Sequence, residues 1–431
     1  MNPKTRPRDW LRRAGLATAA AVCSMAVQAQ TALVATAPQV PTNVANPQSL
    51  RQVFDAAWSR QPEAMALQAR RDAALAQQKA AQAWTPEPVA LELTNKTDRL
   101  NRNQGMRELE VGVAVPIWLP GGRSRSAALA EAEGAAIESR TLAAQLRVAA
   151  TVREAWWQWQ RARIEVDTAR DHVDNTRRIA TDVARRTKAG DLAQADQHQA
   201  GGAVASAEAG MAQAEASLAA AQQHLQALAG VAPSQSGAAG AISELDPGNA
   251  AIAIEAHAAL QELTDRAAVA ERAAALNATQ SRANPELILA TTRDRGAFGE
   301  AAQQTITLGV RIPFGGGPRH DARSAKARAE ATEIQAQLAF ERQRVTAERE
   351  AARVKVEFSR VQLAAVERRA QLARESRGFF DKSFRLGETD LPTRLRIEAE
   401  AAEAERQAAR TRIELAAAIS SWRQALGLIP Q

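Results

Sequence analysis

Cysteine is almost absent from this sequence, and tyrosine is missing altogether. The single cysteine, Cys23, lies near the N-terminus, so disulfides do not stabilise the rest of the chain. Aromatic residues make up only 4% of the 431 residues, which argues against a conventional large core. Hydrophobic residues nevertheless reach 45%, and alanine, the best helix former, supplies much of that fraction. The composition therefore favours closely packed, alanine-rich helices.

Motifs that carry enzymatic or metal chemistry are also missing from the sequence. The histidines form no HxxxH or HxH pair, and no second cysteine completes a cluster of metal ligands. The segment "GGGPR" at 315–319 follows a predicted strand but lacks the lysine and serine of a phosphate-binding loop. We expect no enzymatic activity, no cofactor and no metal site. We expect the histidines on helix surfaces or at helix tips: His172, His198, His224, His257 and His320.

The positive charge of the sequence does not indicate nucleic-acid binding. The formal net charge is +7, of which residues 1–29 contribute +4, so the remainder of the chain is near +3. Arginines alternate with Glu and Asp, as on a solvated helix face, and no basic stripe with aromatic platforms is present. We therefore do not expect nucleic acid as a partner.

The first 29 residues are typical of a secretory signal peptide. Basic residues precede an apolar segment from Ala14 to Val27, and the small-residue site "VQA" ends at Ala29. A membrane anchor is the alternative, but the segment is shorter than the roughly 20 residues that span a bilayer. Lipidation at Cys23 is another alternative, although the preceding valine fits it poorly. We expect cleavage near Ala29, followed by an N-terminal linker at 30–47.

The chain repeats itself. Three pairs of landmarks lie 197 residues apart: Pro116 and Pro313, Gly190 and Gly387, and Leu218 and Leu415. Regular self-similarity of this kind indicates duplication of one structural unit. We predict a first repeat at 48–229, a Gly/Ser/Pro-rich linker at 230–251 and a second repeat at 252–431.

Each repeat contains a pair of segments with alternating apolar and polar residues. We predict strands at 88–97, 108–118, 286–294 and 305–314. A period of two over about ten residues matches a tilted transmembrane β-strand with one apolar face toward lipid. An amphipathic hairpin on a soluble domain would show the same pattern, so the strands alone leave both interpretations open.

Very long helices follow the strand pairs. Ser126–Ala189 contains no proline and one glycine, and His320–Leu386 repeats the pattern. At 1.5 Å per residue, the first segment makes a rod of about 95 Å. A seam with spacings of three or four is typical of coiled-coil packing: Leu142, Leu146, Ala149, Val152, Trp156, Trp159, Val166, Val173, Ala180 and Val183. Such rods do not fit inside a compact domain.

The signal peptide, the duplicated unit and the glycine turns together resemble the TolC-type outer-membrane efflux proteins. The motifs are "VGVAVPIW…GGR" with "LGVRIPFGGG", the two glycine turns and the paired "LAAA…LG" helix ends. The stretch "PIWLPGGRSRSAALAEAE" is most similar to the CzcC-like heavy-metal efflux branch. The resemblance implies a mostly α protein with membrane β structure. Long periplasmic coiled-coil helices from the duplicated unit would accompany four strands of a shared trimeric outer-membrane β-barrel.

The resemblance also implies partners: two further copies of the chain, a periplasmic adaptor (membrane fusion) protein, an inner-membrane pump of the RND or another type, and outer-membrane lipid. The residues independently require oligomerisation, because a barrel needs about eight strands and an open edge in lipid leaves backbone groups unpaired. A dimer or a trimer satisfies that requirement, and the resemblance selects the trimer.

Two kinds of site follow from the resemblance. The strand-to-helix junctions would redirect the chain at the membrane surface: Pro116, Gly121, Gly122, Pro313, Gly315 and Gly316. Beside them, Trp118 and Phe314 would belong to an interfacial aromatic belt, or simply to plain turns. The helical tips would contact the adaptor: Gly190, Asp191, Leu192, Gly387, Glu388, Thr389 and Leu391. The bland alternative for both glycines is a helix C-cap without a partner.

Within the tips, Asp196 is a candidate for a pore constriction. Phe384 and Thr389 stand where relatives often carry a tyrosine and an arginine that close the pore, so that pairing is not expected here. The resulting hypothesis is a passive exit duct of a tripartite efflux system in the outer membrane of a Gram-negative bacterium, which exports small substrates, with heavy-metal cations as candidates. The alternatives are a duct for drugs or type I protein secretion and, in another class, a periplasmic coiled-coil adaptor or scaffold.

Overall fold

The computed structural model describes residues 49–101, 103–233, 244–248, 252–315 and 317–431. The predicted signal peptide with Cys23, the predicted linker at 30–47, residues 234–243 and 249–251 of the predicted second linker, and Gly316 lie outside the described residues. By its internal contacts the chain divides into 1–45 and 46–431, and the structure below is that of the second unit.

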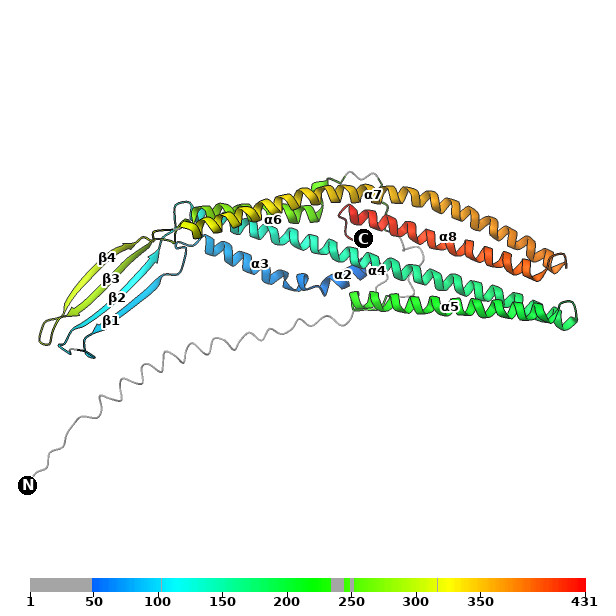
Figure 1. Ribbon diagram of the computed structural model, residues 1–431, viewed down its shortest axis with the longest axis horizontal. Coiled ribbons are helices and arrows are strands. Elements are labelled where there is room, and N and C mark those ends of the chain that lie inside the picture. The colour runs from blue at the N-terminus through cyan, green and yellow to red at the C-terminus, as the bar shows by residue number, and fades with distance from the viewer. Residues whose placement is uncertain (1–48, 102, 234–243, 249–251, 316) are drawn as a thin grey trace, which may run out of the picture. The chain divides into compact units, whose positions relative to one another are not determined.

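The described chain repeats one order of elements: helix, strand pair, long helix and returning helix (Figure 1). The helices of the first half are α2 (Leu50–Ser59), α3 (Pro62–Ala81), α4 (Gly122–Ala189) and α5 (Gln194–Ala229). The second half contains η2 (Ile254–Ala256), α6 (Ala258–Thr279), α7 (Gly317–Arg385) and α8 (Leu391–Ala425). Among the helices of the described ranges, none combines the length and apolar character needed to cross a bilayer.

The strands are β1 (Ala90–Thr97), β2 (Arg107–Pro116), β3 (Glu286–Arg295) and β4 (Gln303–Arg311). They form one antiparallel sheet in the order β1-β2-β3-β4, so that β2 and β3 from the two halves of the chain pair at its centre (Figure 1). The strand ends differ from the predicted ones by up to three residues. β1 and β4 lie at the edges, where their outer backbone groups have no partner strand within the described chain.

The long helices pack as two hairpins, α4 with α5 and α7 with α8, and α4 also contacts α6 and α8. Most of the predicted seam of α4 is buried, as alanine and valine at helical spacing allow close approach. Leu142 was wrongly assigned to the seam, because its side chain is 48% exposed. Ala180 is only half-buried.

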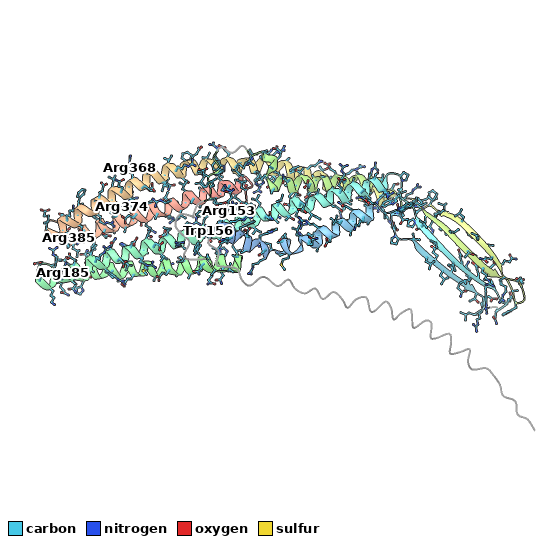
Figure 2. All side chains as sticks on the ribbon, turned by 180° about the vertical axis from the view of Figure 1, so that it is seen from behind. Arg153, Trp156, Arg185, Arg368, Arg374 and Arg385 are labelled. Atoms are coloured by element: carbon cyan, nitrogen blue, oxygen red, sulfur yellow. The ribbon has the colours of Figure 1, made fainter. Side chains whose placement is uncertain are left out.

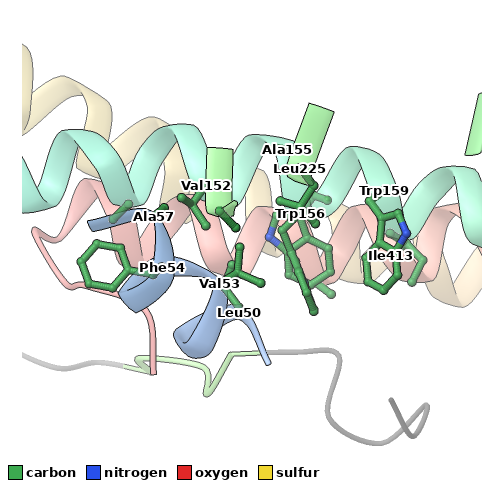
Figure 3. Packing of buried hydrophobic residues seen from close by; sticks show 14 residues of the cluster. Leu50, Val53, Phe54, Ala57, Val152, Ala155, Trp156, Trp159, Leu225 and Ile413 are labelled. Carbon is green, nitrogen blue, oxygen red and sulfur yellow. The ribbon is translucent and has the colours of Figure 1, made fainter. Parts of the chain in front are cut away.

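Several aromatic residues pack together where α2 meets the long helices (Figure 3). Ser49 caps α2 by accepting the N–H of Gln52, and the apolar face of the helix turns toward α4. Trp156 and Trp159 lie with ring centroids 5.1 Å apart and are almost fully buried. The cluster also includes residues from α2, α4, α5 and α8: Leu50, Val53, Phe54, Ala57, Val152, Leu225 and Ile413. Tryptophan thus supplies local bulk that alanine cannot.

Candidate functional site: hairpin tips, junctions and sheet faces

The first hairpin turns at Gly190, which has φ 89° and ends α4 in the left-handed conformation. The N–H of Gly190 donates to the carbonyl of Thr187 (3.1 Å), and the N–H of Asp191 donates to that of Arg186 (3.0 Å). These are the bonds of a Schellman C-cap, which satisfies the last carbonyls of the helix. The turn therefore needs glycine for its backbone.

The second hairpin repeats this turn with the same spacing. Gly387 has φ 78°, its N–H donates to the carbonyl of Phe384 (3.1 Å), and the N–H of Glu388 donates to that of Ser383 (3.0 Å). Asp390 caps α8 by accepting the N–H of Thr393 (3.2 Å), and these hydrogen bonds from Thr393 lower the pKa of the carboxyl. The two repeats of the sequence therefore end their long helices with the same pair of backbone hydrogen bonds.

The residues predicted to contact an adaptor are not equally accessible. Gly190, Asp191, Gly387 and Glu388 are exposed. Leu192 and Thr389 are half-buried, and the Thr389 hydroxyl lies 2.6 Å from that of Ser383. Leu391 is only 2% exposed and packs inside the hairpin, so its predicted place on the contact surface is wrong.

Asp196, the candidate for a pore constriction, has a local role in this structure. Its carboxylate accepts the N–H of Ala193 (3.0 Å) at the start of α5. This is a capping bond, favourable because a carboxylate stabilises the positive end of a helix. The side chain is half-buried, and its role in the pore remains a prediction.

Phe384 joins the two hairpins near their tips, and the sequence analysis missed this role. The ring is 1% exposed and packs against Ile179 and Val183 of α4. Arg186 of α4 stacks on it at 4.9 Å from the centroid, and Arg394 of α8 does so at 4.6 Å. The guanidinium of Arg186 also donates to the Phe384 carbonyl (3.0 Å). Cation–π pairs of this kind stabilise a contact most when they are desolvated.

Carboxylates fix Arg394 in this position. Asp381 of α7 pairs with it directly, and Asp182 of α4 approaches to 3.8 Å. Arg185 and Arg385 lie nearby at the hairpin ends (Figure 2), with Arg385 paired to Asp381 at 2.7 Å. Arg394 thus contacts α4 and α7 from α8, which ties the two hairpins together.

The first strand-to-helix junction is tightly hydrogen-bonded. Pro116 ends β2 and is buried, and the next N–H, that of Ile117, donates to the carbonyl of Pro285 (2.7 Å). Gly121 has φ 73°, and α4 begins at the buried Gly122. The indole of Trp118 donates to the Ala83 carbonyl (3.1 Å), which attaches the end of α3 to the junction.

The second junction is more open. Pro313 follows β4, Gly315 has φ 94°, and the described chain resumes at Gly317 with φ 38°. The Phe314 side chain is 86% exposed. Trp84 is 93% exposed beside the first junction, and the sequence analysis did not single it out.

The sheet has one apolar and one small or polar face. One row across all four strands is apolar on a single side: Leu91, Val113, Leu289 and Leu308. Each of these side chains is at least 37% exposed. On the other side, Gly112 pairs with Ala290, and a Cβ on Gly112 would lie 3.1 Å from that of Ala290. The predicted alternation therefore places bulky residues on one face of the sheet and small ones on the other.

A buried cluster of charged side chains joins the two halves of the chain, which the sequence analysis also missed. Glu244, within the predicted linker, is 7% exposed. Its carboxylate accepts hydrogen bonds from Arg153 of α4 (2.7 and 3.0 Å) and from Arg423 of α8 (3.2 Å), and also from the Ser420 hydroxyl. Figure 2 marks Arg153 close to Trp156. A carboxylate with two arginines and a hydroxyl satisfies a buried charge.

His257 was wrongly expected on a surface. Its side chain is 7% exposed at the start of α6 and packs against Gly427. Burial lowers the pKa of His257, and the positive charge of Arg349 lowers it further. Within the ranges that the structure describes, no group of three or more His, Cys, Asp or Glu is placed to hold a metal ion.

One family model matches part of the chain. Residues 53–231 match the model of a family described as outer membrane efflux protein. Over this stretch the chain is similar to that family. The sequence matches none of the curated proteins.

Solved structures of outer-membrane proteins share the fold. VceC of Vibrio cholerae is 18% identical with a TM-score of 0.68, over 88% of this chain and 96% of VceC. CusC is 15% identical with a TM-score of 0.73, over 88% and 92%. The MtrE outer membrane channel of Neisseria gonorrhoeae is 14% identical with a TM-score of 0.70, over 88% and 89%. The chain thus has the fold of these channels, in which one chain supplies four strands and does not close a barrel alone. The matched family and the similar solved structures are both of outer-membrane proteins.

Proposed function

We propose that this chain is one protomer of a trimeric exit duct, through which a tripartite efflux system releases small substrates across the outer membrane. The observation that carries the proposal is the open sheet, with free edges at β1 and β4 and bulky apolar side chains facing outward. An open edge in lipid leaves backbone groups unsatisfied. Three copies with four strands each would close the sheet and satisfy both edges.

The proposed partners are a periplasmic adaptor and an inner-membrane pump. A periplasmic adaptor would contact the exposed tip residues around Gly190 and Gly387, and an inner-membrane pump of the RND or another type would supply the energy. The duct itself would be passive. Its substrates would pass along the inner face of the sheet, where small and polar side chains such as Gly112 and Thr292 lie.

Heavy-metal cations are the first candidate substrates because of the resemblance at "PIWLPGGRSRSAALAEAE". Drugs and secreted proteins are the alternatives. The growth of a deletion strain on metal salts and on a panel of antibiotics distinguishes metals from drugs. Sensitivity to metals alone supports the first candidate, and sensitivity to antibiotics alone contradicts it.

Cross-linking across the free edges tests the duct itself. Cysteine pairs, with one residue on β1 and one on β4, can form a disulfide only between neighbouring copies, because these strands lie at opposite edges of the sheet. The background is low, since Cys23 is the only cysteine of the sequence. We expect a covalent trimer in the outer-membrane fraction. A soluble periplasmic monomer would instead support the adaptor or scaffold alternative.

A further inference from the structure

Arginines gather on the outward face of the sheet, at the end that carries the two strand turns. Arg293 pairs with Leu109, so both belong to the same face as the apolar rows. One step further along the strands, Arg107 pairs directly with Arg295. Together with Arg99 these arginines line a cavity of ≈ 540 Å³, to whose lining Glu108 and Asp294 also contribute.

The arginines of this face are poorly neutralised by the protein. The guanidinium groups of Arg107 and Arg293 form no hydrogen bond or ion pair with any residue that the structure describes. Arg295 donates to the Gly105 carbonyl (3.3 Å) and stacks on Phe298 at 5.7 Å, which leaves its charge uncompensated. Like charges directly opposite each other on neighbouring strands are destabilising. The Arg107–Arg295 pair therefore favours a bound anion.

The acidic side chains at this end belong to the other face of the sheet. Glu108 and Asp294 are directly opposite each other in the register. Each is next to an arginine in its strand, so its side chain belongs to the opposite face. Glu108 is engaged by Lys96 at 2.7 Å. In the strand register no carboxylate stands directly opposite the arginines of the outward face, although Glu108 and Asp294 border the same cavity.

The height of these arginines matches the edge of a membrane. From Trp118 at the junction to Leu109 the chain covers about 30 Å at about 3.4 Å per residue. With strands tilted by about 40°, this is about 23 Å of height, close to the apolar band of about 25 Å in outer-membrane barrels. Arg293 lies level with Leu109, and Arg107 and Arg295 lie beyond it. They are on the central strands β2 and β3, away from the edges that other copies would cover.

We propose that Arg107, Arg293 and Arg295 bind the phosphate groups of a phosphorylated glycolipid headgroup in the outer leaflet. The proposal rests on the membrane orientation given under the proposed function, in which the helices are periplasmic and the strand turns face outward. Guanidinium groups bind phosphate oxygens in a bidentate manner, with charge-assisted hydrogen bonds. A bound headgroup would neutralise the opposed arginines and fix the depth of the sheet in the membrane.

Native mass spectrometry of the detergent-extracted full-length assembly tests the site, with bisphosphorylated and dephosphorylated lipid A as probes. We expect the wild type to bind the bisphosphorylated lipid at least about tenfold more tightly, because charge-assisted hydrogen bonds depend on the phosphates. The double variant Arg107→Gln/Arg293→Gln should lose this preference, and Arg293→Lys should retain part of it. Inorganic phosphate should not compete at comparable concentration.

Lys96→Gln is the matched control, because it removes one positive charge from the same end of the sheet but from the opposite face. It should keep the preference for the phosphorylated lipid. Equal binding of both lipids by the wild type, unchanged preference in the double variant, loss in the control, or equal competition by inorganic phosphate would each overturn the site. If one of these contrary results is obtained with trimers that fractionate with the outer membrane, it contradicts the lipid site but not the proposed duct. A wild type that is absent from the outer membrane would overturn both.

Discussion

Arg186 is bound to Phe384 in two ways: its guanidinium lies 4.9 Å from the ring centroid and donates a hydrogen bond of 3.0 Å to the backbone carbonyl. Arg394 faces the same ring from α8. The first hairpin is therefore fastened to the second at a residue that is almost fully buried. In a trimeric duct, this attachment would restrain any separation of the hairpins near the proposed pore end.

Phe384→Leu should loosen this attachment while keeping an apolar side chain in the cluster. The change removes both cation–π contacts, each of about 0.5–2 kcal/mol. We expect a higher single-channel conductance in planar bilayers and a normal amount of trimer. The control is Arg396→Gln on α8, where the arginine is 60% exposed and paired only with Glu400 on the same helix. Equal conductance in both variants and the wild type would show that Phe384 does not restrain the pore.

Glu244→Gln should destabilise the protein strongly, because it leaves Arg153 and Arg423 buried without a counter-charge. Breaking a buried pair from one side costs about 3–5 kcal/mol. Thermal unfolding followed by helical circular dichroism measures the loss. Asp246→Asn is the control nearby, since its partner Arg360 is half exposed and such a pair contributes about 0–1 kcal/mol. Similar melting temperatures for both variants would contradict the role given to Glu244.

Local and repeated patterns predicted most of the fold. Alternation located the strands to within three residues, and the spacing of 197 between Gly190 and Gly387 located both hairpin turns. These features depend on neighbouring residues, so one sequence suffices to find them. The heavy-metal branch, in contrast, depended on one short stretch of similarity.

Contacts between distant residues could not be predicted in the same way. Glu244 lies in a stretch whose composition indicates a linker, and its partner Arg153 is 91 residues away. His257 was expected to be exposed and is buried, whereas Leu142 was expected to be buried and is exposed. Helical periodicity does not say which neighbours cover a helix. Leu391 resembled an exposed tip residue until the packing beneath Phe384 showed it to be buried.

Val113→Arg should impair assembly far more than Glu110→Arg. Val113 belongs to the outward apolar row, whereas Glu110 lies on the inner face. A lipid-facing arginine near the middle of the membrane costs about 2–4 kcal/mol, while an inner one mainly alters the pore. The measurement is the amount of trimer in the outer-membrane fraction. If Glu110→Arg abolishes the trimer and Val113→Arg does not, the two faces have been assigned the wrong way round.

His257 should make stability depend on pH. Because burial and Arg349 lower its pKa in the folded state, the unfolded state binds the proton more readily. Stability should therefore fall as the pH drops below 6.5, the ordinary pKa of histidine, and on toward the lower pKa of the folded state. Glu341 opposes this shift and Arg344 adds to it. In the His257→Gln variant the melting temperature should change less between about pH 7 and 5 than in the wild type. His198→Gln, at an exposed position, should leave that pH dependence as it is in the wild type. A parallel decline in all three proteins would exclude His257 as the cause.

Gly387→Val tests whether the second tip contacts the adaptor. Gly387 has φ 78°, and no atom lies within 4 Å of the position that a Cβ would take. The cost is therefore confined to the backbone, about 1–2 kcal/mol for a side chain in the left-handed conformation. The interfaces of a trimer should tolerate that cost, but relief of the strain would reshape the turn around Glu388. We expect near-normal trimer abundance, reduced cross-linking to the adaptor and lower efflux-dependent resistance.

Gly378→Val is the matched control for this variant. It places the same side chain within helix α7, which ends just before Gly387, also with no atom within 4 Å of the added Cβ, but without a left-handed backbone. It should keep both the trimer and the resistance, because valine destabilises an exposed helix position less than it destabilises a turn in the left-handed conformation. Full resistance and full cross-linking in Gly387→Val would mean that this hairpin is not the docking site. Loss of the trimer in Gly387→Val but not in Gly378→Val would make the glycine a structural C-cap without a separate role in docking.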